Sequence, residues 1–288
     1  MWRSSPYAYA KASWIIGKSF LGKRMALLNG IHTLDELDKL IFPDNYKELP
    51  GKELLPDLEK RIMKRSERQI LSVVSSFAEP PKLLIRMKAA ESPPSITARH
   101  RSGESSSSAN SIEYYKGLID CLWQLESEDR EAAAKLISDE ISLLNSLWVL
   151  RLRTYYQKNE MEIIKHLMDS RLLGGVYQKG IAAEVRMAMD FSLDVRQEWK
   201  GWRWERFLNK DEVSEHWIID PRYFQNAASL YLYQRSLHNF HSLPMSVSAI
   251  YCFIKLKHFE QDILISVAEG LSIGMDSSSV FKLLEGAF

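Results

Sequence analysis

Hydrophobic positions recur every three or four residues along most of the chain, and this spacing is typical of amphipathic α-helices. Strand-like alternation of apolar and polar residues is nearly absent. The few glycine and proline residues fall between the periodic segments, where they mark turns. The pattern therefore predicts an all-α protein, with about ten helices packed in bundles.

Local signals predict where individual helices begin and end. Ser5 suits an N-cap and Pro6 the first helical position, so we expect a helix that runs from there toward Leu28. Thr33 and Glu36 have capping-box spacing at the start of a short helix. Further helices are expected at 54–77, 112–125, 129–157, from a turn at 172–175 to about 208, and at 222–240, 245–270 and 277–285.

Residues 91–111, ESPPSITARHRSGESSSSANS, differ sharply in composition from the helical segments. They hold almost no side chain that can be buried, and they are rich in serine. A segment of this kind gains too little from burial to offset the entropy of ordering it. We therefore predict a mobile loop or linker here.

The overall composition is that of a globular protein, with 45% hydrophobic and 26% charged residues. A net charge of +1 gives no overall field that would favour nucleic acid. The two cysteines, Cys121 and Cys252, lie in apolar helical patterns, so we expect neither a disulfide nor a metal framework, and a reducing compartment fits. MSVSAIYCFI, the longest nearly uncharged run near the end, is too short to cross a bilayer. The protein is expected to be soluble, or to rest against a membrane without crossing it.

Residues 12–19, ASWIIGKS, match the loose form of a phosphate-binding loop, in which Lys18 would reach the phosphates and Ser19 would hold magnesium. Such a loop follows a buried strand and uses glycines to let backbone N–H groups crowd an anion. Here no apolar strand precedes it, and the branched and aromatic residues of WII occupy the loop positions. We interpret the segment as part of a helix, and a nucleotide hydrolase stays an alternative function.

Three other patterns suggest binding. His238 and His241 could face one metal on a helix, but no third ligand is marked, so we favour the polar edge of an amphipathic helix. A basic stripe on the third predicted helix could meet phosphates, lipid headgroups or an acidic partner, although a solvated face is the simpler interpretation. The stripe consists of Lys60, Arg61, Lys64, Arg65 and Arg68.

The third pattern is WKGWRWERF, residues 199–207, which interleaves tryptophans with basic residues. This mixture is typical of surfaces that contact proteins or membrane interfaces. It would also suit stacking on nucleic-acid bases. The candidate contact residues are Trp199, Trp202, Arg203, Trp204 and Arg206. Packing of the tryptophans in the core is an equally open alternative.

Four stretches taken in order resemble one known family. They are YAYAKASWIIGKSFL followed by LDELDKLIF; the paired-tyrosine segment IEYYKGLIDCL; EISLLNSLWVLR, with Glu140, Asn145 and Arg151 at characteristic places and LLGG after it; and PMSVSAIYCFIKLKHFEQDILISVAEGLSIG. Together they resemble the C-type subunit of the bacterial and archaeal A/V-type rotary ATPases, whose eukaryotic counterpart is the d-type subunit.

The resemblance implies a fold of three related helical-bundle lobes in a pseudo-threefold funnel. On this chain the lobes would cover 1–95, 111–210 and 211–288, with a Ser/Pro-rich linker at 96–110. It implies no enzymatic activity, no cofactor and no metal. The expected partners are the proteolipid ring of the membrane sector and central stalk subunits of the D and F type. The protein would lie on the cytoplasmic face of the membrane and transmit torque for ATP-driven ion transport or ATP synthesis, without a nucleic-acid partner.

Within this picture, Glu140, Asn145 and Arg151 are predicted to form a structural polar lock. Asn145 stands among leucines in the middle of a long helix, and a buried amide has to be hydrogen-bonded. The alternative functions are a helical adaptor with other partners, a nucleotide or metal hydrolase, and a nucleic-acid binder.

Overall fold

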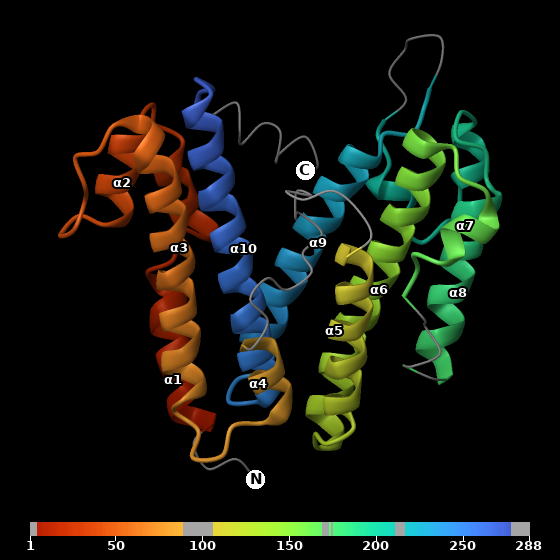
Figure 1. The fold of residues 1–288 in the computed structure, drawn as a ribbon. Helices are drawn as coiled ribbons and strands as arrows, with labels where there is room; N and C mark the ends of the chain where they lie inside the picture. Colours follow the sequence, from red (N-terminus) through yellow and green to blue (C-terminus); the bar gives the residue numbers. More distant parts are fainter. Residues whose placement is uncertain (1–4, 89–105, 169–172, 174, 211–216, 278–288) are drawn as a thin grey trace. The chain divides into compact units, whose positions relative to one another are not determined.

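The structure is a computed structural model that describes residues 5–88, 106–168, 173, 175–210 and 217–277 (Figure 1). Within these residues the regular secondary structure is helical throughout, and no strand occurs. The prediction of an all-α protein is thus confirmed. The arrangement of three related lobes about an axis stays a prediction.

The chain divides into two compact units. Of the described residues, the first unit combines 5–88 with 236–277, and the second unit comprises those between 106 and 235. The three consecutive lobes stay a prediction, and the described residues of the expected third lobe, 211–288, occur in both units. The helix α9 (Pro221–Ser242) carries the chain from the second unit into the first.

The first unit is built around two long helices, α3 (Gly51–Val74) and α10 (Val247–Ser272), which lie side by side (Figure 1). The helices α1 (Ser5–Gly17), α2 (Leu34–Ile41) and α4 (Lys82–Lys88) pack against this pair. Residues from distant parts of the sequence meet in its core, among them Phe20, Leu28, Leu37, Leu58, Ile62, Leu264 and Val267.

The first predicted helix is shorter than expected. It ends at Gly17 instead of continuing to Leu28, and the short 3₁₀ helix η1 (Gly22–Leu28) follows it. Gly22 has a φ of 54°, in the left-handed region that glycine adopts at little cost, so the chain changes direction here. At the next helix, α2, the expected N-cap is present, because the Thr33 hydroxyl accepts a hydrogen bond from the Glu36 N–H at 3.2 Å.

The second unit centres on α6 (Ser127–Tyr156), whose middle turns are buried on nearly every side. The helices α5 (Ser106–Leu122), α7 (Glu160–Ile164) and α8 (Gly175–Asp190) pack against it. The 3₁₀ turns η3 (Arg196–Trp199) and η4 (Glu205–Phe207) lead toward α9. The core therefore surrounds one long helix that carries polar as well as apolar side chains.

Two boundaries in the second unit differ from the prediction. The helix expected to reach about 208 ends at Asp190, and 3₁₀ turns replace its second half. The helix α5 begins at Ser106, inside the segment predicted as a linker. Residues 91–105 of that linker and nearly all of the predicted helix 277–285 lie outside the described residues.

Candidate interaction site

The tryptophan-rich segment 199–207 turns its indole rings into the second unit. Trp199, Trp202 and Trp204 are only 0%, 2% and 1% exposed. Each indole N–H is hydrogen-bonded: to Ser192 O at 2.7 Å, to Glu184 O at 3.1 Å and to Ser142 Oγ at 3.0 Å, respectively. The prediction that these rings offer a partner surface is corrected, because rings packed and bonded in this way belong to the core.

Ring contacts join this segment to α9. Trp202 stacks on Phe224 with centroids 5.6 Å apart, and Trp204 meets Tyr231 at 5.5 Å. Phe207 stacks on Trp204 at 5.4 Å and also approaches Tyr231 at 5.6 Å. Aromatic pairs at such separations stabilise beyond their buried area. They hold the irregular segment in one conformation.

The two arginines of the segment remain at the surface. The guanidinium of Arg206 lies 5.1 Å from the Phe207 ring centroid and 5.6 Å from that of Tyr231. That of Arg203 lies 4.2 Å from the Trp204 centroid. These cation–π contacts hold both cations over a rigid aromatic base, which lowers the entropy that a partner contact would cost.

The two arginines differ in how their charges are balanced. Arg203 forms an ion pair with the buried carboxylate of Asp139, which also accepts a hydrogen bond from the Tyr231 hydroxyl at 2.7 Å. Burial raises the pKa of Tyr231, and its bond to Asp139 adds to the effect. Arg206 makes no ion pair or hydrogen bond within the described part of the chain. The surface therefore presents one neutralised and one available cation.

Asn145 is buried, with 2% exposure, in the middle of α6. Its amide N–H donates to Met168 O at 3.0 Å, and its carbonyl accepts from the Met168 N–H at 2.9 Å. The pair joins α6 to the segment after α7 through two neutral hydrogen bonds. The other two residues of the predicted lock lie apart from this contact: Glu140 is buried in α6, and Arg151 donates to Gln225 Oε1 at 2.5 Å.

Arg153 has a role that the sequence did not indicate. Its guanidinium donates to the carbonyl oxygens of Ala188, at 2.6 Å, and Phe191, at 2.8 Å. These carbonyls lie at the C-terminal end of α8, where the last carbonyls have no partner within the helix. Arg153 thus caps α8 from α6.

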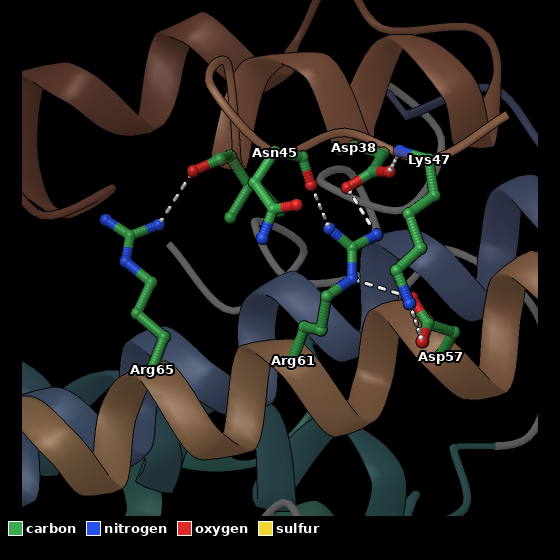
Figure 2. A network of polar contacts seen from close by, with 7 residues as sticks. Asp38, Asn45, Lys47, Asp57, Arg61 and Arg65 are labelled. Atoms are coloured by element: carbon green, nitrogen blue, oxygen red, sulfur yellow. Dashed lines mark hydrogen bonds and ion pairs between the residues drawn. The ribbon is translucent and has the colours of Figure 1, made fainter.

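The basic stripe of α3 divides into two groups. Lys60, Lys64 and Arg68 are exposed, whereas Arg61 and Arg65 point toward α2 and the loop that follows it (Figure 2). Arg61 forms ion pairs with Asp38 and Asp57, both at 2.7 Å, and donates to Asn45 O at 2.9 Å. Its bonds hold the loop against α3, so only part of the stripe is a solvated face.

A buried ion pair links α10 to the end of α1 in the first unit. The Lys257 ammonium pairs with the Glu260 carboxylate, and both residues are almost completely buried. Glu260 also accepts from the Phe20 N–H at 2.7 Å, and Lys257 donates to Ser19 Oγ at 3.3 Å. Burial lowers the pKa of Lys257, and Glu260 opposes that shift. Only the spacing of three residues between the two charges hints at this pair in the sequence.

The structure confirms a helix for residues 12–17 of ASWIIGKS, and Lys18 and Ser19 lie in the turn that follows. Ser5–Gly17 is helical, and the Ser19 hydroxyl donates to Ile15 O at 3.0 Å from a buried position. The Lys18 ammonium lies 4.1 Å from the Trp14 ring centroid, at the surface. Among the described residues no group of three or more metal-binding side chains occurs, and Cys121 and Cys252 form no disulfide.

Comparison with known proteins adds one relative. A protein of Treponema pallidum (strain Nichols), described as an uncharacterized protein, is 26% identical to this chain over 320 residues. The match covers 93% of this chain and 92% of the length of the Treponema protein. No family model matches the chain, and no solved structure matches it. Of the helices in the described ranges, none combines the length and apolar character needed to span a membrane.

Proposed function

We propose that this protein is a non-catalytic coupling subunit of a V/A-type rotary ATPase. It joins the central stalk, through subunits of the D and F type, to the proteolipid ring, and it transmits torque in ATP-driven ion transport or ATP synthesis. In this role it is peripheral, on the cytoplasmic face of the membrane, and needs no cofactor, metal or nucleic acid. A three-lobed funnel would be the arrangement that receives the stalk.

The observation that supports the proposal is the ordered resemblance of four stretches to the C-type subunit of that family. In the structure all four stretches fall mainly on helices: the first on α1 and α2, the second on α5, the third on α6 and the fourth on α10. An all-α chain in which these helices succeed one another in the same order agrees with the family's architecture. Each stretch taken alone supports the proposal less than the four stretches in this order.

The interior of each unit suits a part that carries torque. In the second unit Asn145 joins two segments through paired hydrogen bonds, and in the first unit Lys257 and Glu260 join α10 to the end of α1. Directional contacts within close-packed cores resist sliding of one helix past another. A coupling subunit needs this stiffness, because a compliant one would store rotation as deformation.

Arg206 is our candidate for a partner contact, with Arg203 beside it. An available guanidinium held over aromatic rings suits a carboxylate on a neighbouring subunit, since arginine is enriched among residues that dominate binding energy. Of the five contact residues expected from the sequence, only the two arginines remain candidates, because the three tryptophans are buried. An acidic face on the stalk or ring would provide the complementary charge.

A helical adaptor with other partners is the second candidate. The paired, exposed tyrosines at the end of α6 support it, because Tyr155 and Tyr156 are 51% and 66% exposed. Exposed aromatic side chains of this kind are common in protein-binding surfaces of many classes.

Affinity purification of the tagged full chain from membranes of its own cells tests the proposal. If it is right, mass spectrometry finds the proteolipid and the central stalk subunits in near-stoichiometric amounts. Recovery of a stoichiometric complex that lacks rotary ATPase subunits would favour the adaptor and refute the rotor assignment.

Two variants with the same change of charge test the contact residue. Arg206→Glu should reduce recovery of the stalk or ring several-fold, because a carboxylate partner would be repelled. Lys135→Glu, at an exposed position of the same unit, should leave recovery unchanged. Equal recovery with both variants would show that Arg206 is not a contact residue, and it would leave the rotor assignment unaffected.

A further inference from the structure

Two arginines from different elements of the first unit converge on one aromatic ring. The guanidinium of Arg24, in η1, lies 5.7 Å from the Phe20 ring centroid, and that of Arg65, in α3, lies 5.6 Å from it. Arg65 also lies 6.0 Å from the Phe42 centroid. Rings thus hold two cations close together, although like charges repel.

The hydrogen-bond donors of both groups are largely unused. Arg65 donates to Ile41 O at 3.4 Å, a long bond drawn at one end of Figure 2. Arg24 is exposed, and within the described residues its guanidinium makes no hydrogen bond or ion pair. A guanidinium carries several N–H donors in a planar fork that matches an oxyanion. Most of these donors are therefore available at this place.

Arg61, one helical turn before Arg65, shows what a structural arginine looks like in the same surroundings. It meets two carboxylates and a backbone carbonyl (Figure 2). Together with Lys47, which pairs with Asp57 at 2.7 Å, it forms a neutral group of two cations and two anions. Asp38 of α2 and Asp57 of α3 are thus committed to Arg61 and Lys47, and Arg65 forms no ion pair with either of them.

Charges near Arg65 leave a surplus of two. Arg24, Arg65 and Lys257 are three cations, whereas Glu260 is the one anion that acts on Arg65 within the described residues. Glu260 is already bound by the Lys257 ammonium and the Phe20 N–H. Burial lowers the pKa of Arg65, repulsion from Arg24 lowers it further, and attraction to Glu260 opposes both.

A small cavity bordered by Arg65, Ser66, Lys257 and Glu260 has a volume of about 10 Å³. That space corresponds to one water molecule and is too small for a tetrahedral oxyanion. A larger ligand has to approach Arg65 from the solvent side, which is also where the exposed Arg24 is reached.

We propose that Arg24 and Arg65 form a binding site for a phosphate group. A dianionic phosphate neutralises both surplus charges, whereas a single carboxylate neutralises one. Its oxygens accept from both guanidiniums in the bidentate geometry that arginine provides. The inference rests on the first unit alone and does not depend on the proposed rotor function. The phosphate is either free in solution or the headgroup of a lipid such as phosphatidic acid.

Isothermal titration calorimetry of the full chain with inorganic phosphate tests the site. We expect saturable binding that Arg24→Gln with Arg65→Gln weakens at least tenfold, as the loss of charge-assisted hydrogen bonds requires. Arg24→Gln alone should weaken binding by several-fold, and this exposed position keeps the test valid if the double variant fails to fold. Lys64→Gln with Arg68→Gln removes the same charge from an exposed face of α3 and should leave binding within twofold.

A second arm uses vesicles of phosphatidylcholine with and without phosphatidic acid. Binding to the acidic vesicles that Arg24→Gln abolishes, without saturable binding of inorganic phosphate, identifies a lipid headgroup as the source. Binding of inorganic phosphate without vesicle binding identifies a soluble phosphate. Absence of both, or equal losses in the Lys64 and Arg68 control, overturns the proposal.

Discussion

Each unit of this protein contains a buried polar contact between distant segments, but the two contacts differ in kind. In the second unit a neutral amide, Asn145, exchanges two hydrogen bonds with the backbone of Met168. In the first unit the charged pair of Lys257 and Glu260 occupies the corresponding role. Burying a neutral amide carries a smaller desolvation penalty than burying two charges. Removing one partner of a buried ion pair is strongly destabilising, because the other charge is left unpaired. Two contacts that both join distant helical segments should therefore differ in how strongly they respond to mutation and to pH.

Breaking the ion pair should have the largest effect. Lys257→Met leaves the Glu260 carboxylate buried with only the Phe20 N–H, and it should lower the free energy of unfolding by about 3–5 kcal/mol. Replacing both residues, as Lys257→Met with Glu260→Met, should cost much less, because no charge is left unpaired. Hydrogen exchange measured on α1 and α10 checks both. A double variant as unstable as the single one would contradict this account.

The neutral contact should be less costly to remove. Asn145→Ala leaves both backbone groups of Met168 unsatisfied in a buried place, with a loss of roughly 2–4 kcal/mol. Because no titratable group is involved, the loss should be the same at pH 5 and pH 8. Hydrogen exchange of α6 and of the segment after α7 measures it. A loss that varies strongly with pH would show that a charged neighbour, rather than the amide, controls this contact.

His258 should make the first unit acid-sensitive. Burial, aided by Lys255 and Lys257, lowers the pKa of His258 from 6.5 to about 3. Above pH 6.5 the residue is neutral in both the folded and the unfolded state, so it has no effect on stability there. Between pH 6.5 and 3 only the unfolded state binds the proton, so the free energy of unfolding falls by up to about 1.4 kcal/mol per pH unit.

The matched variant His258→Gln isolates this contribution from the carboxylates, which titrate in the same range. Urea unfolding of both proteins and hydrogen exchange in α10 are measured between pH 7 and 4. The free energy of unfolding should decline less steeply with falling pH in the variant. Parallel declines would mean that His258 accepts a proton in the folded state. The second unit, with its neutral contact, serves as the internal reference.

Lys18 should give the smallest effect. It lies at the surface over the Trp14 ring, so Lys18→Ala should change the free energy of unfolding by less than about 0.5 kcal/mol. Equilibrium dialysis of the same variant against ATP and magnesium examines the alternative of a nucleotide hydrolase. ATP binding by the unmodified chain that disappears in this variant would restore that alternative.

Patterns within one segment predicted the helices well, and features that depend on distant segments were missed. The long helices α3, α6 and α10 follow directly from apolar spacing, because that spacing reflects a local geometry. The end of α1 at Gly17 and the end of α8 at Asp190 did not follow from the local pattern. Beyond α8, the rings of the following segment pack onto α9, and such tertiary contacts override helix propensity.

The candidate sites show the same limit. The sequence identified Arg203 and Arg206 as binding residues, but it could not separate them from the tryptophans beside them, since burial depends on what packs against the segment. Likewise, the basic stripe on α3 is visible in the sequence as a charge pattern. Which of its arginines has an ion-pair partner depends on other elements, because Arg61 pairs with Asp38 of α2 and Arg65 is near Glu260 of α10.

The sequence by itself determined that this chain is helical, where its longest helices lie, and that Asn145 has to find a partner if it is buried. Those properties follow from periodicity and from the cost of an unpaired amide, which are local. Only the tertiary structure decided which arginines stay available, that three tryptophans are core residues, and that Lys257 meets Glu260 beside Phe20. Such choices depend on distances between segments far apart in the chain, and no local pattern encodes them.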